Sequence, residues 1–117
     1  MKFWLSRMAQ KGKIGVLEKN IEKYLNDNVK KLGGRCYKFT SPGNAGVPDR
    51  LILLPGGVIY FVELKTKYKK PRPLQKSQIR KLEMLGQDVR VLCGLDDVKE
   101  FVDEITRLPE VLCRKDS

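Results

Sequence analysis

The sequence predicts an α/β fold in a single domain, with a central mixed sheet flanked by helices. Two observations predict this fold. Apolar residues recur at helical spacing in three segments and at strand spacing in the segments between them. The last two predicted strands are separated by one predicted helix, and a strand that follows such a crossover lies parallel to the strand before it. The 117 residues also have the length of one compact domain.

The N-terminal half of the chain predicts one helix and three strands. Residues 16–32 carry apolar side chains at 3.6-residue spacing and end at Gly33-Gly34, which predicts the first helix. Residues 35–40 alternate weakly and predict a strand. The strands predicted at 49–54 and 58–65 are apolar on both faces. We therefore expect these two strands to form a hairpin in the middle of the sheet, covered on both sides.

The C-terminal half predicts a helix, a strand and a last helix. The second helix covers residues 74–85 and stops at Gly86, and the fourth strand covers residues 89–93. Asp96 or Asp97 is predicted to cap the last helix, which Pro109 ends. We interpret residues 1–13 as a basic N-terminal tail and residues 109–117 as a C-terminal tail.

The composition excludes several kinds of site. The chain contains no histidine, which excludes Ser-His-Asp and Cys-His catalysis and His-ligated zinc. Its three cysteines include no Cys-x-x-Cys pair, so neither a disulfide framework nor a zinc site is expected. No apolar run has the length of a signal-peptide core or of the ~18–20 residues of a membrane span. We expect a soluble cytoplasmic protein whose catalysis depends on carboxylates, lysine or a hard metal.

Positive charge is concentrated after the predicted hairpin. The chain has 24 Lys and Arg against 14 Asp and Glu, a formal net charge of +10. The segment between Leu64 and Leu82 contains eight Lys and Arg residues and no acidic residue. A phosphate-bearing polymer is the natural partner of such a surface, and a merely solvated charged surface is the alternative. The predicted nucleic-acid-binding residues are Lys67, Lys69, Lys70, Arg72, Lys76 and Arg80, together with Asn44 and Arg50.

The predicted hairpin brings two acids together. If Pro55-Gly56-Gly57 is a three-residue loop, Leu54 pairs with Val58 and Asp49 lies opposite Glu63. Directly paired residues share a face, with Cβ atoms roughly 4.5–5.5 Å apart, a separation that like charges resist unless a cation lies between them. Lys65 points to the same side. The alternative is a plain salt-bridge cluster in which Lys65 neutralises the acids.

Two helices carry polar residues where apolar ones are expected. Glu18 lies on the apolar face of the first helix, so it has a partner or reaches water from the edge of that face. Glu22 lies at the edge and reaches solvent more easily. Gln75 lies on the arc of the second helix that faces the sheet near the two acids, although a partly exposed amide is the commoner situation.

Acids and a lysine at one strand end suit phosphodiester hydrolysis. Mg²⁺ prefers oxygen ligands and keeps several waters, so two or three carboxylates and a substrate phosphate complete its coordination shell. A metal-activated water attacks phosphorus without any histidine. Lys65 is then placed to orient that water or to stabilise charge on the phosphate oxygens.

Three sequence motifs resemble a known nuclease family. They are Gly46-Val47-Pro48-Asp49, Phe61-Val62-Glu63-Leu64-Lys65 and Leu74-Gln75. Together, in this order of elements, they resemble the VRR-NUC family of the PD-(D/E)xK nuclease superfamily, and the stand-alone, phage-type members in particular. The resemblance covers residues 16–101. It implies a restriction-endonuclease-like αβββαβ core.

The resemblance also implies roles for individual residues. Asp49, Glu63 and the Leu64 carbonyl are implied to bind Mg²⁺ or Mn²⁺, and Lys65 to be catalytic. Glu18 matches the acidic residue that such families place on their first helix, and Gln75 matches the family's helix glutamine. We therefore include Glu18 with the metal ligands and Glu18 and Gln75 with the candidate catalytic residues.

The sequence thus favours a metal-dependent endonuclease that acts on branched DNA. The small stand-alone members of the family resemble homodimeric Holliday-junction resolvases, and symmetric cleavage of a four-way junction needs two sites. The alternatives are a non-catalytic basic nucleic-acid-binding module and a nuclease of the same fold that acts on flaps, ends or RNA. No segment that reads base edges is evident, so we expect selection by DNA shape.

Overall fold

The computed structural model describes residues 14–66 and 69–116, with side chains described for residues 19–66 and 69–113. The elements in chain order are α2 (Ile14–Lys31), β1 (Arg35–Lys38), β2 (Arg50–Leu54), a 3₁₀ turn η2 (Pro55–Gly57), β3 (Val58–Lys65), α3 (Pro73–Met84), β4 (Asp88–Cys93), α4 (Gly94–Thr106) and α5 (Pro109–Asp116). The α/β class, the order of the predicted elements and their types are confirmed.

The four strands form one mixed sheet in the order β1-β2-β3-β4. β2 pairs antiparallel with β1 and with β3, whereas β3 and β4 are parallel across the α3 crossover, as predicted. Leu54 pairs with Val58 and Arg50 with Val62, so the predicted hairpin register is confirmed. The hairpin occupies the two central positions of the sheet.

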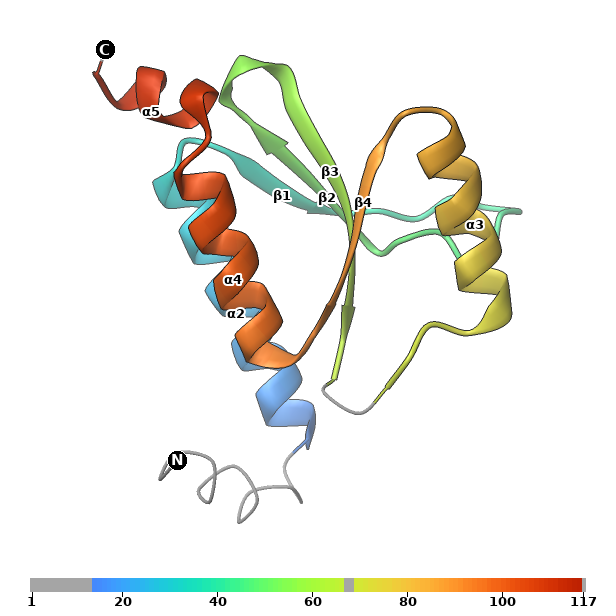
Figure 1. The fold of residues 1–117 in the computed structure, drawn as a ribbon. Coiled ribbons are helices and arrows are strands. Elements are labelled where there is room, and N and C mark those ends of the chain that lie inside the picture. The colour runs from blue at the N-terminus through green and yellow to red at the C-terminus, as the bar shows by residue number, and fades with distance from the viewer. Residues whose placement is uncertain (1–13, 67–68, 117) are drawn as a thin grey trace.

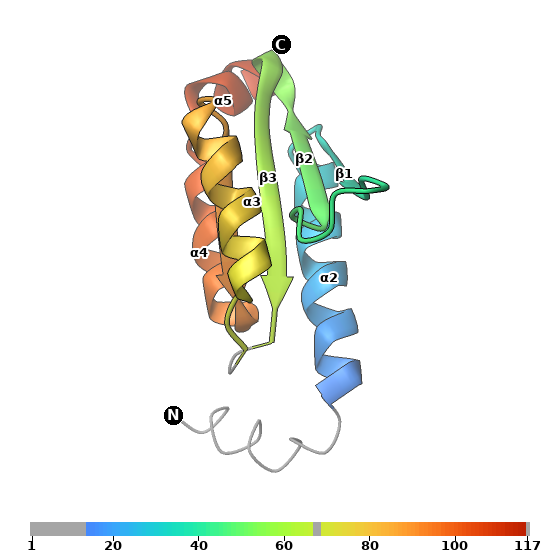
Figure 2. The ribbon, with the colours of Figure 1, turned by 90° about the vertical axis from the view of Figure 1, so that its right-hand side faces the viewer.

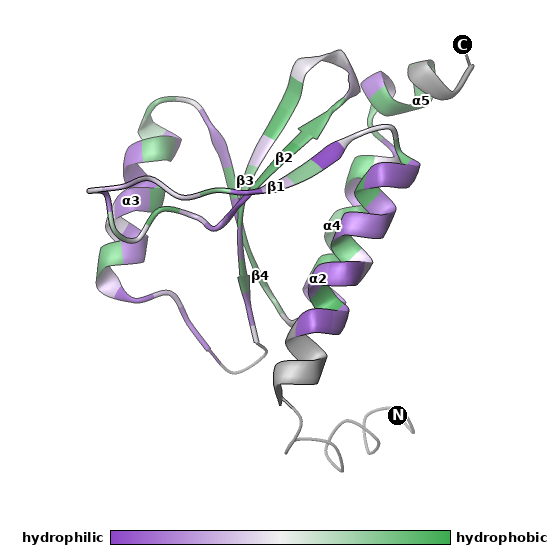
Figure 3. Ribbon diagram, turned by 180° about the vertical axis from the view of Figure 1, so that it is seen from behind, coloured by the Kyte–Doolittle hydropathy of each residue, from purple (hydrophilic) through white to green (hydrophobic). Residues whose placement is uncertain are grey.

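Helices lie on both sides of the sheet but cover it unequally. α2 and α4 pack together on one face, and α3 lies against the other near β4 (Figure 1). A view turned by 90° shows α3 in front of the sheet with α2 and α4 behind it (Figure 2). The α2/α4 side holds the core, because Leu25 and Val29 of α2 are fully buried against Ile52 and Val62 of the sheet. Hydropathy colouring shows polar residues on the outer surfaces of α2 and α4 (Figure 3).

Coverage of the hairpin on both sides is only partly as predicted. On the α3 side of the hairpin the apolar side chains of Leu51, Leu53 and Phe61 are only half-buried, and Ile59 remains 42% exposed. The reason is that α3 is short and spans only part of its face of the sheet (Figure 1).

The predicted cap of the last helix is wrong. The chain turns at Gly94, whose φ is +85°, and α4 starts there, before Asp96 and Asp97. The Asp97 carboxylate instead accepts a hydrogen bond of 2.8 Å from the Cys93 N–H, a backbone donor just ahead of the helix.

The predicted C-terminal tail is also wrong over most of its length. Residues 109–116 form α5, and Val111 is fully buried in the core between α4 and the hairpin turn. Pro109, read from the sequence as a stop, begins α5 instead, because proline is favoured at the first helical position. The predicted tail at residues 1–13 lies outside the described residues. Within the described part of the chain, no helix combines the length and apolarity needed to cross a membrane.

Truncation of Val111 tests whether α5 belongs to the core. We expect Val111→Ala to lower the free energy of unfolding by about 1–3 kcal/mol, because buried methyl groups are lost and a cavity remains. The neighbouring Leu112→Ala, at a side chain 45% exposed, is the control and should cost clearly less. Chemical denaturation measures both values, and equal losses would contradict the assignment of α5 to the core.

Candidate active site

A pocket of about 180 Å³ lies where β2 and β3 meet the N-terminal half of α2. Its lining includes Glu22 from α2, Asp49 and Arg50 at the start of β2, and Leu64 and Lys65 at the end of β3, with Lys69 from the loop that follows. Two features of the backbone around Asp49 fix its position there. Pro48 before it is fully buried, and the Asp49 carbonyl accepts a 2.8 Å hydrogen bond from the Phe39 N–H.

The two acids predicted to face each other do so at this end of the hairpin. Asp49 immediately precedes β2, one position beyond the Arg50–Val62 pair, and therefore stands opposite Glu63. Each carboxylate accepts a hydrogen bond from the other strand. The Asp49 N–H donates to Glu63 Oε1 and the Leu64 N–H donates to Asp49 Oδ1, both at 3.2 Å. The backbone thus holds both side chains in place.

The second oxygen of Glu63 is held by two further side chains. Lys65 Nζ lies 3.2 Å from Glu63 Oε2, and Gln75 Nε2 donates to the same oxygen at 3.0 Å. Gln75 is 8% exposed, and its Oε1 accepts the Arg72 N–H at 2.9 Å, which caps the first turn of α3. Gln75 therefore ties the start of α3 to the carboxylate pair, and the prediction that it faces this cluster is confirmed.

Burial makes the pair costly to ionise. Loss of hydration raises the pKa of Asp49 above its ordinary value of 3.8, and hydrogen bonding by the Leu64 N–H only partly opposes this. Burial also raises the pKa of Glu63, and the nearby Asp49 charge raises it further against the effect of Lys65. Lys65 lowers both pKa values and Arg50 lowers that of Asp49, but these charges do not overcome the effect of burial.

Arg50 differs from its predicted role as an exposed nucleic-acid contact. Its side chain is almost fully buried, and its guanidinium forms an ion pair with Glu22 of α2. The buried Arg50 Nε has no hydrogen-bond partner among the described residues. Arg50 thus joins β2 to α2 at the pocket. Glu22, which helix periodicity places at an exposed edge, is a pocket residue that the sequence analysis missed.

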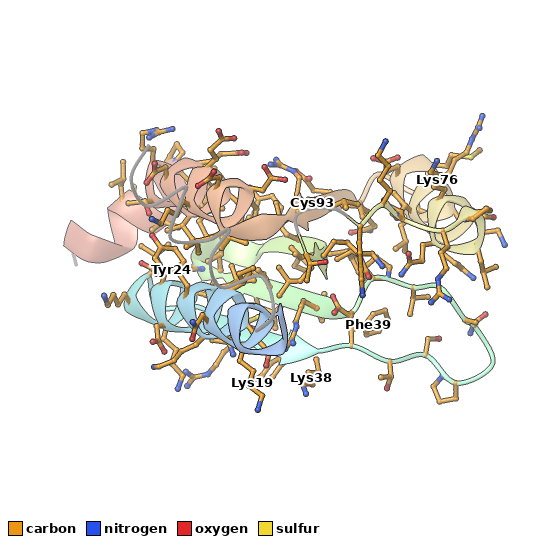
Figure 4. The ribbon with its side chains drawn as sticks, turned by 90° about the horizontal axis from the view of Figure 1, so that it is seen from below. Lys19, Tyr24, Lys38, Phe39, Lys76 and Cys93 are labelled. Carbon is orange, nitrogen blue, oxygen red and sulfur yellow. The ribbon has the colours of Figure 1, made fainter. Side chains whose placement is uncertain are left out.

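The remaining predicted residues fall into three groups. The side chain of Glu18 and the whole of Lys67 lie outside the described residues. Asn44 donates to Ser41 Oγ at 2.9 Å and so supports its own loop. The cations that follow the pocket are exposed on the loop and along α3, from which Lys76 projects in Figure 4; they are Lys69, Lys70, Arg72, Lys76 and Arg80.

The donor set at the pocket fits a hard divalent cation. Asp49 and Glu63 supply carboxylate oxygens from neighbouring strands, each held by a backbone N–H of the other strand. Mg²⁺ is commonly bound through one or two carboxylates with waters in its other positions. Among the described residues no group of three histidine, cysteine or acidic side chains could hold a metal ion.

Comparison with known proteins shows the family to which the chain belongs. No family model matches the sequence. The chain is 49% identical over 81 residues to "Putative nuclease p44" of Acyrthosiphon pisum secondary endosymbiont phage 1, covering 69% of this chain and 87% of that protein. A solved structure described as "VRR_NUC domain" matches with a TM-score of 0.69 and 33% identity over 74% of this chain and 94% of its own. The chain belongs to the VRR-NUC family of nucleases.

A second solved VRR-NUC structure supports the fold alone. It is described as "VRR_NUC domain protein" and matches with a TM-score of 0.63 at 21% identity, over 80% of this chain and 90% of its own. The VRR-NUC resemblance drawn from the Asp49, Glu63-x-Lys65 and Gln75 motifs is confirmed by these comparisons.

Replacement of Asp49 by asparagine should stabilise the metal-free protein at neutral pH. The folded state holds the Asp49 proton more tightly than the unfolded chain does, so wild-type stability falls as pH rises from about 3.8 through the raised pKa. Asp49→Asn removes this loss. We expect a higher unfolding temperature than wild type at pH 7 in EDTA, with the difference disappearing as pH falls towards 3.8.

The matched control is Asp103→Asn, which removes the same charge from an exposed position on α4. Thermal unfolding followed by circular dichroism measures all three proteins. Equal shifts for both variants at pH 7 would show that net charge, and not burial of the pair, is responsible.

Proposed function

We propose that this VRR-NUC protein is a Mg²⁺- or Mn²⁺-dependent endonuclease that hydrolyses phosphodiester bonds in branched DNA. The observation that carries the proposal is the pair of Asp49 and Glu63, held together by backbone hydrogen bonds and beside Lys65, with Asp49 and Lys65 lining a pocket. Carboxylates whose ionisation is opposed by burial are concentrated at functional sites. Binding a divalent cation is the function that fits two neighbouring carboxylates.

The ligands proposed for the cation are Asp49, Glu63 and the Leu64 carbonyl, with Glu18 as a fourth. When bound, the cation would supply Lewis acidity, drawing charge from the phosphate and making water a better nucleophile. The hydrogen bonds from the Leu64 and Asp49 N–H groups fix the two carboxylates before the cation arrives, so little reorganisation is needed on binding.

Lys65 is the proposed catalytic cation. Its ammonium is largely buried, pairs with Glu63 and lines the same pocket as Asp49. In this position it is within reach of a phosphate oxygen or a water in the pocket. An ammonium held in a partly desolvated site stabilises the negative charge that develops on phosphate oxygens during attack.

The substrate is proposed to be DNA held mainly through its phosphates. Exposed cations continue from Lys69 at the pocket along α3 to Arg80. Contacts of this type position a backbone and carry no base information, so selection rests on DNA shape. We propose four-way junctions as the preferred shape and a homodimer as the active form, because two symmetric cuts need two sites and each chain has one candidate site.

Cleavage of labelled DNA tests this proposal. We expect wild type to cut a four-way junction at paired, symmetric positions with Mg²⁺ or Mn²⁺ and not with EDTA. Asp49→Asn and Lys65→Ala should each lower the rate by about 10²–10⁴-fold while junction binding persists. Sedimentation of the protein with and without junction measures the proposed dimer.

The substrate panel separates the alternatives. Preferential cutting of a flap, a single strand or RNA would keep the site and overturn the junction assignment. Unchanged binding by wild type and both variants, with no cutting under any metal condition, would indicate a non-catalytic nucleic-acid-binding module. A purely monomeric active form would contradict the dimer.

Gln75 is proposed to act as a positioning residue for Glu63. Gln75→Ala removes both the hydrogen bond to Glu63 and the acceptor for the Arg72 N–H. We expect the cleavage rate to fall about 10–100-fold, the loss typical of outer-shell partners of metal ligands, and the Mg²⁺ concentration for half-maximal rate to rise. Gln78→Ala is the control, because Gln78 also lies on α3 but donates to the Ala45 carbonyl in the loop between β1 and β2 and not to Glu63. Equal effects of the two substitutions, or an unchanged Mg²⁺ requirement for Gln75→Ala, would contradict this role.

A further inference from the structure

A second and larger cavity, of about 600 Å³, lies between the outer side of α2 and the edge strand β1. Its charged lining consists of Lys19, Lys23, Lys30, Arg35, Glu22 and Asp27. We call this cavity the α2–β1 groove. None of its cations belongs to the exposed basic series on α3, so it is a separate positively charged surface.

The acids of the α2–β1 groove are already neutralised within the chain. Asp27 forms an ion pair of 2.8 Å with Lys23, and Glu22 pairs with the buried Arg50. Over residues 19–66 and 69–113, no acid lies within ion-pair distance of Lys19, Lys30 or Arg35. Among the described residues, the groove therefore presents three cations without an ion-pair partner to a molecule that enters it.

The α2–β1 groove adjoins the candidate active site, because Glu22 lines both cavities. In Figure 4, Lys19 and Lys38 lie at the edge formed by α2 and β1, and Lys76 lies across the molecule on α3. The lining of the candidate active site thus includes Lys69, which starts the exposed cations that lead to α3, and Glu22, which it shares with the cationic groove. Because Glu22 is paired with Arg50, the repulsion between its carboxylate and an anionic chain near the two cavities is reduced.

We propose that the α2–β1 groove binds the sugar-phosphate backbone of the substrate on one side of the cleaved bond, while the cations of α3 bind it on the other side. This inference rests on the proposed function, because the position of the groove beside the proposed nuclease pocket is what favours a nucleic acid over an acidic protein as the occupant. Spaced cations without acidic neighbours match the regular phosphates of such a chain.

Paired variants test the groove. Lys30→Ala/Arg35→Ala removes two exposed cations from its lining. The control, Lys31→Ala/Arg107→Ala, removes two exposed cations outside it, and Lys30 and Lys31 both belong to the last turn of α2, so the effect on the helix end is matched. Binding of a junction and of a linear duplex is measured in EDTA by fluorescence anisotropy over a range of salt concentrations, and hydroxyl-radical footprinting locates the protected nucleotides.

We expect the groove variant to bind roughly tenfold more weakly near 0.1 M salt, with a slope of log K against log salt smaller by about 2, since each lost phosphate contact removes about 0.9. Its footprint should shorten on one side of the cleaved position only. The control should keep the wild-type footprint and lose clearly less affinity. Equal losses in the two variants, an unchanged footprint, or nucleic-acid binding that is unaffected by the groove substitutions would overturn the proposal, the last in favour of an acidic protein as occupant.

The outcome is separable from that of the proposed function. Binding and footprinting in EDTA need no cleavage, so a protein that cuts no substrate can still show the one-sided loss. Conversely, metal-dependent cutting together with unaltered binding by the groove variant would keep the nuclease assignment and remove the groove from the substrate path. Unfolding temperatures of both double variants confirm that the comparison is made between folded proteins.

Discussion

The pairing register of β2 and β3 is the constraint on which the candidate site depends. Because Leu54 pairs with Val58 across a three-residue turn, Asp49 comes to stand opposite Glu63, and the backbone of each strand donates a hydrogen bond to the carboxylate of the other. A shift of one residue would turn one of the two acids to the other face of the sheet. The central hairpin therefore determines the position of the two acids, and α2 and α3 add contacts around them.

The rest of the fold secures this pair on opposite sides. Gln75 connects Glu63 to the first turn of α3, and the Arg50–Glu22 pair connects the start of β2 to α2. These contacts hold two partly buried carboxylates together although burial raises the pKa of both. Burial of the pair opposes folding stability, and under the proposed function the same arrangement would preorganise the two carboxylates for a cation, an exchange of stability for function that is common at active sites.

Short-range patterns predicted most of this site, and long-range pairing accounts for what they missed. The turn length gave the register, and with it Asp49, Glu63 and Lys65, while helical spacing placed Gln75 towards the sheet. The sequence analysis did not predict Glu22 as a pocket residue, because its partner Arg50 is 28 positions away. Periodicity within one helix carries no information about such a partner. The sequence analysis did not predict α5, because its eight residues are too few for a clear periodic pattern. Only tertiary packing shows that Val111 is buried.

The most direct test of the account is the dependence of the unfolding temperature on Mg²⁺ concentration for wild type and Asp49→Asn. If the buried pair is a cation site, the wild-type unfolding temperature rises with Mg²⁺ as expected for a ligand that binds only the folded state. The Asp49→Asn protein should start higher in EDTA and respond little. An unfolding temperature that is independent of Mg²⁺ in wild type, or that rises equally in both proteins, would contradict the claim that Asp49 and Glu63 are held together to bind a metal ion.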